Sequence, residues 1–126
     1  MFEFDKDYTR TEIQQLIGGE IQTYLPQKNK IILAGCFNRE LNPNCPYEIQ
    51  AGSKNKVAQK AALLISLPHI EFPVFIKETK SSKYYRFDGI YRCVGGTSAA
   101  EALAEAEQRS GRSGELSHVL HLEAVS

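Results

Sequence analysis

The chain has 126 residues, of which 42% are hydrophobic, and its 15 basic residues balance its 15 acidic residues. This length and composition fit one globular domain over residues 1–126, with too few residues for two domains of ordinary size. No apolar run approaches the roughly 18 residues of a membrane span, and the first residues, MFEFDKDYTR, lack the basic and then apolar order of a secretory signal. We therefore expect a cytoplasmic protein with no membrane partner.

The N-terminal part of the chain predicts a helix, a strand and a long loop. Thr9 and Glu12 have the spacing of a capping box, in which a hydroxyl and a carboxylate satisfy free amides of the first helical turn, so a helix is expected from there to Gly18. The short apolar run IILAGCF, at 31–37, indicates a strand. Residues 38–52 show no obvious periodicity, and a connection of that length in a compact domain is more often functional than not.

Two more helices are predicted further along the chain. Ser53 is placed to cap a helix over 54–66, which the following Leu-Pro step ends. Ser98 and Glu101 repeat the capping-box spacing and predict a helix over 99–109. With the first helix, this makes three.

Strand patterns fill the remaining segments. Alternating or aromatic-rich runs lie at 72–78 and 83–94, and a less regular alternation at 116–125 suits a closing strand. The segment 78–83 reads as a hairpin turn, and Asp88-Gly89 as a second turn or a bulge. The order of elements predicts an α+β domain with a mixed or mainly antiparallel sheet and about three flanking helices.

The cysteines and histidines provide no pattern of a catalytic or metal site. Cys36, Cys45 and Cys93 lack the spacing of a zinc site or a disulfide framework, and no sequence motif places a histidine beside any of them. No glycine-rich phosphate loop is present either. We expect no catalytic residue, no metal and no cofactor, and we expect Cys36 and Cys93 to be core residues of strands.

The charges are unevenly distributed although they cancel in total. Between Thr23 and Arg92 eleven basic residues accompany five acidic ones, a net charge of +6, whereas the segments before and after each carry −3. Such asymmetry can form a basic face on a neutral protein, and solvated helix and strand faces explain it equally well. At the predicted helix start in AGSKNK, a serine and two lysines would favour an anion, because free amides and the positive end of the helix dipole lie there.

The stretch LNPNCPYEIQAG, at 41–52, is unusually stiff and apolar for a loop. Pro43 and Pro46 fix their own φ angles and push the preceding residues toward extended geometry. Arg39 precedes this stretch, and its planar guanidinium can donate to guanine O6 and N7 together. A rigid loop of this kind favours a binding surface.

Three segments together resemble the sulfur-binding domain of the phosphorothioate-dependent, type IV (modification-dependent) restriction endonucleases of the McrA-like HNH group. They are YTRTEIQQLIGGEIQTYLP, IILAGCFNRELNPNCPYEIQAG, and FPVFIK with YYRFDGIYRC, and they span about residues 8–93. The most distinctive element is NPNCPYEI, which is similar to the family's Tyr-Pro or Ala-Pro element with a small apolar residue three positions later; here Cys45 precedes the proline. The HNH motif of the family's nuclease part is absent, so we expect a recognition domain that does not cut DNA and that works with a nuclease domain or partner subunit in bacterial defence.

The resemblance implies binding of double-stranded DNA in which sulfur replaces one non-bridging phosphate oxygen and docks in a hydrophobic surface pocket. Pressing a hydrated phosphate oxygen against carbon removes its water without compensation, whereas sulfur is more polarisable and a weaker acceptor and therefore loses less. The residues that the resemblance assigns to the sulfur pocket are Cys45, Pro46 and Ile49, with Tyr47 at the rim. The residues expected to contact bases or backbone of the DNA are Asn38, Arg39, Asn42, Lys28, Lys30, Ser53, Lys54 and Lys56.

Three other functions remain open at this point. A reader of a different modified base would need a deep aromatic cavity, which the tyrosines between Tyr84 and Tyr91 could line. A protein-interaction module would dock a partner on the proline loop, with the lysines serving only solubility. A thiol enzyme would require an activated cysteine, with Cys45 as the candidate.

Overall fold

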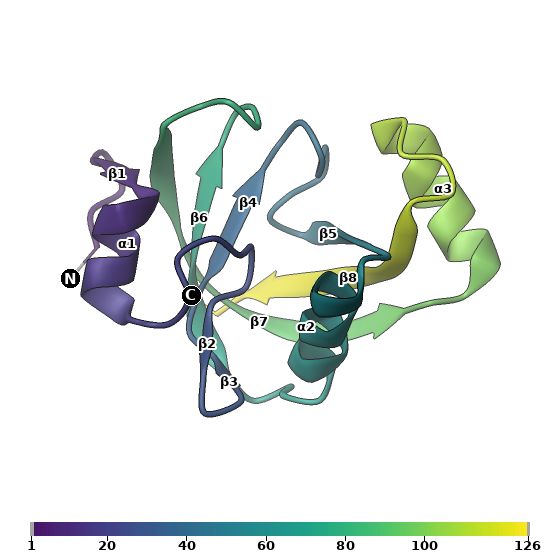
Figure 1. Cartoon of the computed structure of the whole chain (residues 1–126), viewed down its shortest axis with the longest axis horizontal. Helices are drawn as coiled ribbons and strands as arrows, with labels where there is room; N and C mark the ends of the chain where they lie inside the picture. The colour runs from purple at the N-terminus through teal and green to yellow at the C-terminus, as the bar shows by residue number, and fades with distance from the viewer. Residues whose placement is uncertain (1, 126) are drawn as a thin grey trace.

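The computed structural model describes residues 2–125 and contains eight strands and three helices within them (Figure 1). The expected α+β class, with three helices and a mixed, mostly antiparallel sheet, is confirmed. The elements are β1 (Asp7–Thr9), α1 (Arg10–Ile17), β2 (Gln27–Lys28), β3 (Ile31–Ile32), β4 (Gly35–Asn38), β5 (Glu48–Gly52), α2 (Asn55–Ile65), β6 (Glu71–Lys77), β7 (Tyr84–Thr97), α3 (Ala100–Ser110) and β8 (Leu116–Ala124).

The main sheet has the strand order β4-β6-β7-β8-β5, and β1 pairs with the first residues of β7. Only the pair β4 and β6 is parallel; the others are antiparallel. The strands β4 and β5 therefore lie at opposite ends of the strand order, although only nine residues of chain separate them. The hairpin of β2 and β3 forms a separate small sheet.

The long strand β7 organises this sheet because its two halves have different neighbours. Its first half pairs with β6, and its second half pairs with β8. The pairing with β6 shifts register where Val74 faces Gly89 and Phe75 faces Phe87, which leaves Asp88 as a bulge. Gly89 has φ +138° there, a conformation that residues with side chains rarely adopt, so the expected irregularity at Asp88-Gly89 is confirmed.

Side-chain alternation along the strands divides the core between the two faces of the sheet. On β6, Val74 and Ile76 pack into the large cluster that α2 covers, whereas Phe75 between them packs into the cluster beneath α1. A third, smaller cluster of Ala106, Leu116 and Val119 lies beneath α3. Figure 1 shows α1 and α3 toward the two ends of the sheet and α2 between them.

Of the three predicted helix caps, the structure has the first and lacks the other two. Thr9 and Glu12 form the full capping box, so the first prediction is confirmed. Ser53 and Ser98 do not cap: α2 begins after Lys54 and α3 after Ala99, and neither helix has a side-chain cap. The backbone N–H of Ser53 instead donates to Glu115 O at 2.8 Å. This bond ties the residues before α2 to the residue that precedes β8.

The other differences concern short strands. The predicted strand at 31–37 is divided into β3 and β4, and the second half of the predicted loop at 38–52 is strand β5, paired with β8. These strands are too short for a periodicity to show, and their pairing partners lie far away in the sequence. Among residues 2–125, no helix is long and apolar enough to cross a lipid bilayer.

Candidate functional site

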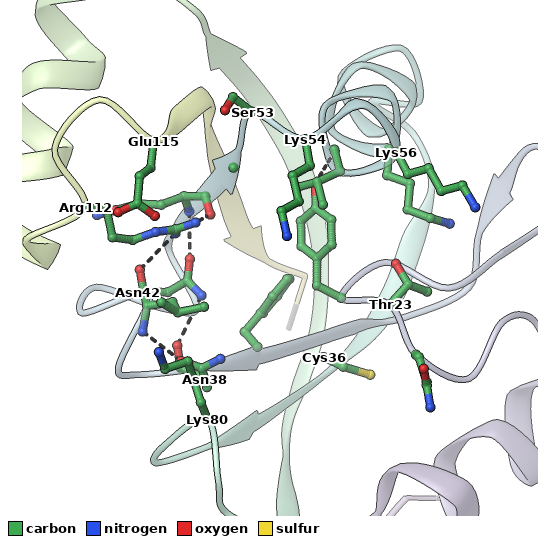
Figure 2. A pocket seen from close by; sticks show the side chains of 18 of the residues that line it. Thr23, Cys36, Asn38, Asn42, Ser53, Lys54, Lys56, Lys80, Arg112 and Glu115 are labelled. Carbon is green, nitrogen blue, oxygen red and sulfur yellow. Dashed lines mark hydrogen bonds between the residues drawn. The ribbon is translucent and has the colours of Figure 1, made fainter.

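A groove of about 880 Å³ lies between the edge strands β4 and β5. The segment 20–24 and the first turns of α2 form its other walls. Figure 2 shows Lys54 and Lys56 across the groove from Asn42 and Arg112. The groove therefore lies between β4 and β5, the two ends of the strand order, which do not pair with each other.

Cationic residues dominate the lining of the groove. Five of its residues are basic and two are acidic: Lys54, Lys56, Lys60, Lys80 and Arg112, with Glu20 and Glu115. Glu20 is already neutralised by Lys60, whose hydrogen bond holds the pKa of that carboxyl below its ordinary value. Lys54 and Lys56 are exposed and make no ion pair with a carboxylate among residues 2–125. The groove is thus suited to an anionic ligand.

The side chain of Asn42 joins the two edge strands at the base of the groove. Its Nδ2 donates to Asn38 O at 3.1 Å, and its Oδ1 accepts the backbone N–H of Gln50 at 2.7 Å. Asn38 ends β4 and Gln50 lies in β5, so one buried amide connects strands that do not pair with each other. Asn42 was expected to contact DNA bases; it lines the groove, but it is only 6% exposed and both ends of its amide are bonded within the protein, so the structure gives it a linking role.

Arg112 supports the same wall from the segment between α3 and β8. Its Nη1 donates to Gln50 O at 3.0 Å and to Leu41 O at 3.4 Å. Burial lowers the pKa of the guanidinium from its ordinary value. The Nε of Arg112 and the Oε1 of Gln50 are buried without a hydrogen-bond partner among the described residues. Buried polar atoms in native proteins nearly always have partners, so these two atoms are exceptions. The amide of Gln50 points toward α3, where its Nε2 donates to Ala106 O at 3.0 Å.

Carbon surface lies between these polar groups. Ile21, Leu41 and Val57 line the groove, as do the rings of Tyr24 and Phe37. The Tyr24 hydroxyl donates to Val57 O at 2.8 Å and fixes the ring against the start of α2. Burial raises the pKa of Tyr24 far above its ordinary value, so this ring stays neutral. The groove therefore offers apolar contacts directly beside cations.

The structure places the residues of the expected sulfur pocket in the core, apart from Tyr47. Cys45 is 4% exposed, Ile49 is 0% exposed, and Pro46 is buried as well, so these three side chains close the core and form no surface for DNA. Ile49 lies in β5 and packs into the cluster beneath α2, as Cys45 does. The apolar residues of the loop are therefore used in the core. Tyr47 is 60% exposed and packs edge-on against Tyr91, outside the groove.

The expected DNA contacts are only partly brought together. Asn38, Ser53, Lys54 and Lys56 line the groove with Asn42. Arg39 lies outside it, where its Nε is 2.9 Å from Glu78 Oε2 and its Nη1 donates to Cys45 O. Lys28 and Lys30 lie outside it too, on and after strand β2 of the small hairpin.

Sequence reasoning missed Tyr24, Lys60, Lys80 and Arg112 as groove residues. Each comes from a different segment: the loop after α1, the second turn of α2, the β6–β7 turn and the connection to β8. The excess of basic residues between Thr23 and Arg92 was the signal in the sequence that pointed to two of them, Lys60 and Lys80.

The thiols are unsuited to nucleophilic chemistry. All three cysteines are free and buried. Burial raises the pKa of Cys36 and of Cys45 to about 11, and raises the pKa of Cys93 as well. Because the thiolate is the nucleophile, these groups remain unreactive at neutral pH. Among residues 2–125, no three His, Cys, Asp or Glu side chains gather as metal ligands.

Comparison of the chain with protein-family models, with curated proteins and with solved structures finds no match.

Replacing Asn42 by alanine tests the link between the edge strands. We expect Asn42→Ala to lower the free energy of unfolding by about 1 to 3 kcal/mol, because the buried N–H of Gln50 loses its acceptor. Urea denaturation measures this change. Asn44→Ala is the matched control, since Asn44 is exposed in the same loop. An equal loss in both variants would contradict the linking role.

The thiols should be protected in the native protein. At pH 8 we expect Ellman's reagent to label none of the three cysteines until the protein is unfolded, when all three react. Because the folded protein holds the Cys36 proton more tightly than the unfolded chain, this thiol's contribution to stability is complete below about pH 9 and decreases as the pH rises toward 11. Rapid labelling of one cysteine in the native state would instead support an activated thiol.

Proposed function

We propose that this domain binds double-stranded DNA along the groove between β4 and β5, as the recognition module of a modification-dependent restriction system. The observation that carries the proposal is the cationic groove, in which Lys54 and Lys56 have no carboxylate partners among residues 2–125. A polyanion gains affinity from each lysine or arginine that neutralises a phosphate and releases counterions. The resemblance to the sulfur-binding domain suggests phosphorothioate as the modification.

A sulfur atom would find its apolar contact on a different residue from those expected. Leu41 belongs to the same loop and lines the groove. Its backbone carbonyl accepts a hydrogen bond from Arg112, so a cation lies next to it. Ile21, which is 41% exposed, adds carbon surface within the groove. A phosphate drawn in by the cations and turned toward Leu41 would lose hydration as an oxygen linkage and gain dispersion contacts as a sulfur linkage.

A second candidate function is the reading of a modified base, and the size and polar lining of the groove favour it. About 880 Å³ is more than enough for an extruded nucleotide, and the partly exposed amide of Asn38 can bond to a base edge. The Asn38 amide at the end of β4 is the specific group that supports this candidate. The aromatic residue would be Tyr24, since Phe37, Tyr85 and Tyr91 are buried in the core.

Binding of three matched duplexes tests these proposals. We expect salt-dependent binding to plain DNA, and binding at least tenfold tighter when a single phosphorothioate of the preferred stereochemistry is present, because one such contact is worth about 1 to 3 kcal/mol. The third duplex carries 5-methylcytosine in place of the sulfur. Fluorescence anisotropy over a range of salt concentrations measures all three.

Each outcome of that comparison separates two functions. Equal affinity for the plain and sulfur-containing duplexes would rule out sulfur recognition, and a preference for 5-methylcytosine would support the base reader. No salt-dependent binding to any duplex would reject DNA as the ligand and favour a protein-interaction module. Lys54→Gln should weaken binding to all duplexes and reduce the slope of log affinity against log salt by about one. The control is Arg92→Gln, which removes the same charge from a residue of β7 that is paired with Glu123 and lies outside the groove.

Leu41→Gln should remove the preference for sulfur while changing the affinity for plain DNA less than twofold. The amide puts polar atoms in place of the carbon surface that rewards sulfur over oxygen. The matched control is Tyr47→Ala, which removes an exposed aromatic residue of the same loop outside the groove. Loss of the preference with Tyr47→Ala, and not with Leu41→Gln, would assign the sulfur contact to the outer surface of the loop.

A further inference from the structure

A second hollow of about 470 Å³ adjoins the groove on the side of α1. It lies between the first residue of α1, the segment 21–24 and the turn that joins β6 to β7. The two share several lining residues, among them Thr23, Tyr24, Asn38 and Lys80, so a ligand can extend from one into the other. None of the residues predicted from sequence to bind DNA accounts for this hollow except Asn38 at its border.

Among the described residues, the lining of the hollow includes four cationic side chains and no acidic one. The cationic residues are Arg10, Lys77, Lys80 and Lys83. Lys77 is held in place, since its Nζ donates to Lys80 O at 2.9 Å and to Ser82 O at 3.2 Å and lies 5.1 Å from the centre of the Tyr85 ring. Lys83 is exposed and lies over the Tyr84 ring. Lys80 has one weak carboxylate neighbour, Glu40, at 3.8 Å. Four cationic residues thus line a hollow whose described lining includes no carboxylate.

Arg10 carries the strongest indication of a missing ligand. Its Nη2 donates to Glu20 O at 2.6 Å and to Thr23 O at 3.4 Å, which positions the segment shared by the two cavities. Its Nε and Nη1 are buried and have no hydrogen-bond partner among the described residues. A buried, charged donor without an acceptor is costly, and an anion in the adjoining hollow would supply the acceptor. The same side chain therefore shapes the groove and has unused donors beside it.

We propose that this hollow binds a phosphate group of the nucleic-acid strand that occupies the groove. The inference rests on the proposed DNA-binding function and adds a second, separate phosphate site to it. A phosphate offers several acceptor oxygens to donors that approach from different elements, which matches guanidinium and ammonium groups from α1 and from the β6–β7 turn. A carboxylate ligand would have fewer oxygens to share among these donors.

Substitutions that remove one positive charge, in the hollow or in the groove, test the site. We expect Lys83→Gln to weaken binding of a plain duplex by about threefold to tenfold and to reduce the slope of log affinity against log salt by about one, because one phosphate contact is lost. Lys54→Gln reports on the groove alone, and Arg92→Gln is the distant control. Thermal unfolding of each variant confirms that the fold is kept.

The Nε–H signal of Arg10 in 15N-labelled protein supplies a direct readout. We expect this signal to shift when the duplex is added, because a phosphate oxygen then accepts from the buried guanidinium. A shift with millimolar inorganic phosphate but none with the duplex would overturn the assignment to nucleic acid and leave a free-phosphate site.

The outcomes keep the two proposals apart. If the wild-type protein binds the duplex and Lys54→Gln weakens it while Lys83→Gln and the Arg10 signal show no change, the phosphate site is wrong and the groove proposal stands. If the wild-type protein binds no duplex at any salt concentration, both proposals are wrong.

Discussion

The amide of Asn42 is the interaction on which the rest of the site depends. It bonds to Asn38 at the end of β4 and to Gln50 in β5, the two ends of the strand order. Without such a link a curved sheet leaves two free edges, whose backbone groups must find other partners. The amide joins these edges at one point only, so the space beside it remains open as the groove. Arg112 strengthens the same connection by donating to Gln50 O and Leu41 O.

The groove shows how a protein with no net charge acquires a strongly cationic surface. Its basic residues come from the loop region after β6, from the first turns of α2 and from the segment before β8, and the fold places all of them around one space. Most of the acidic residues lie elsewhere, and Glu20, which lies here, is paired with Lys60. Charges focused in a cleft act on a ligand more strongly than the same charges spread over a surface.

Two features of the groove bear on the proposed recognition of modified DNA. Leu41 and Ile21 place carbon next to cations, which rewards a soft, weakly hydrated atom beside a phosphate. Arg112 has a buried Nε without a partner among the described residues at this wall, and Asn38 has a partly exposed amide, which together reward a group with matching donors and acceptors. The first arrangement suits sulfur in the linkage and the second a base, and both rely on the same phosphate-attracting lysines.

The sequence by itself determined the class of fold, most of the long elements and part of the groove. The capping box at Thr9, the turn at 78–83 and the lysines at the start of α2 depend on neighbours within a few residues, and such local signals survive in sequence. Tertiary structure alone decided what the stiff loop at 41–52 does. Its apolar residues Cys45, Pro46 and Ile49 turned inward because β5 pairs with β8, about 70 residues away, and that pairing sets which side chains face the core. The same long-range pairing brought Arg112 to the groove. The sequence did not predict this contact, because a contact between distant segments leaves no periodicity in either of them.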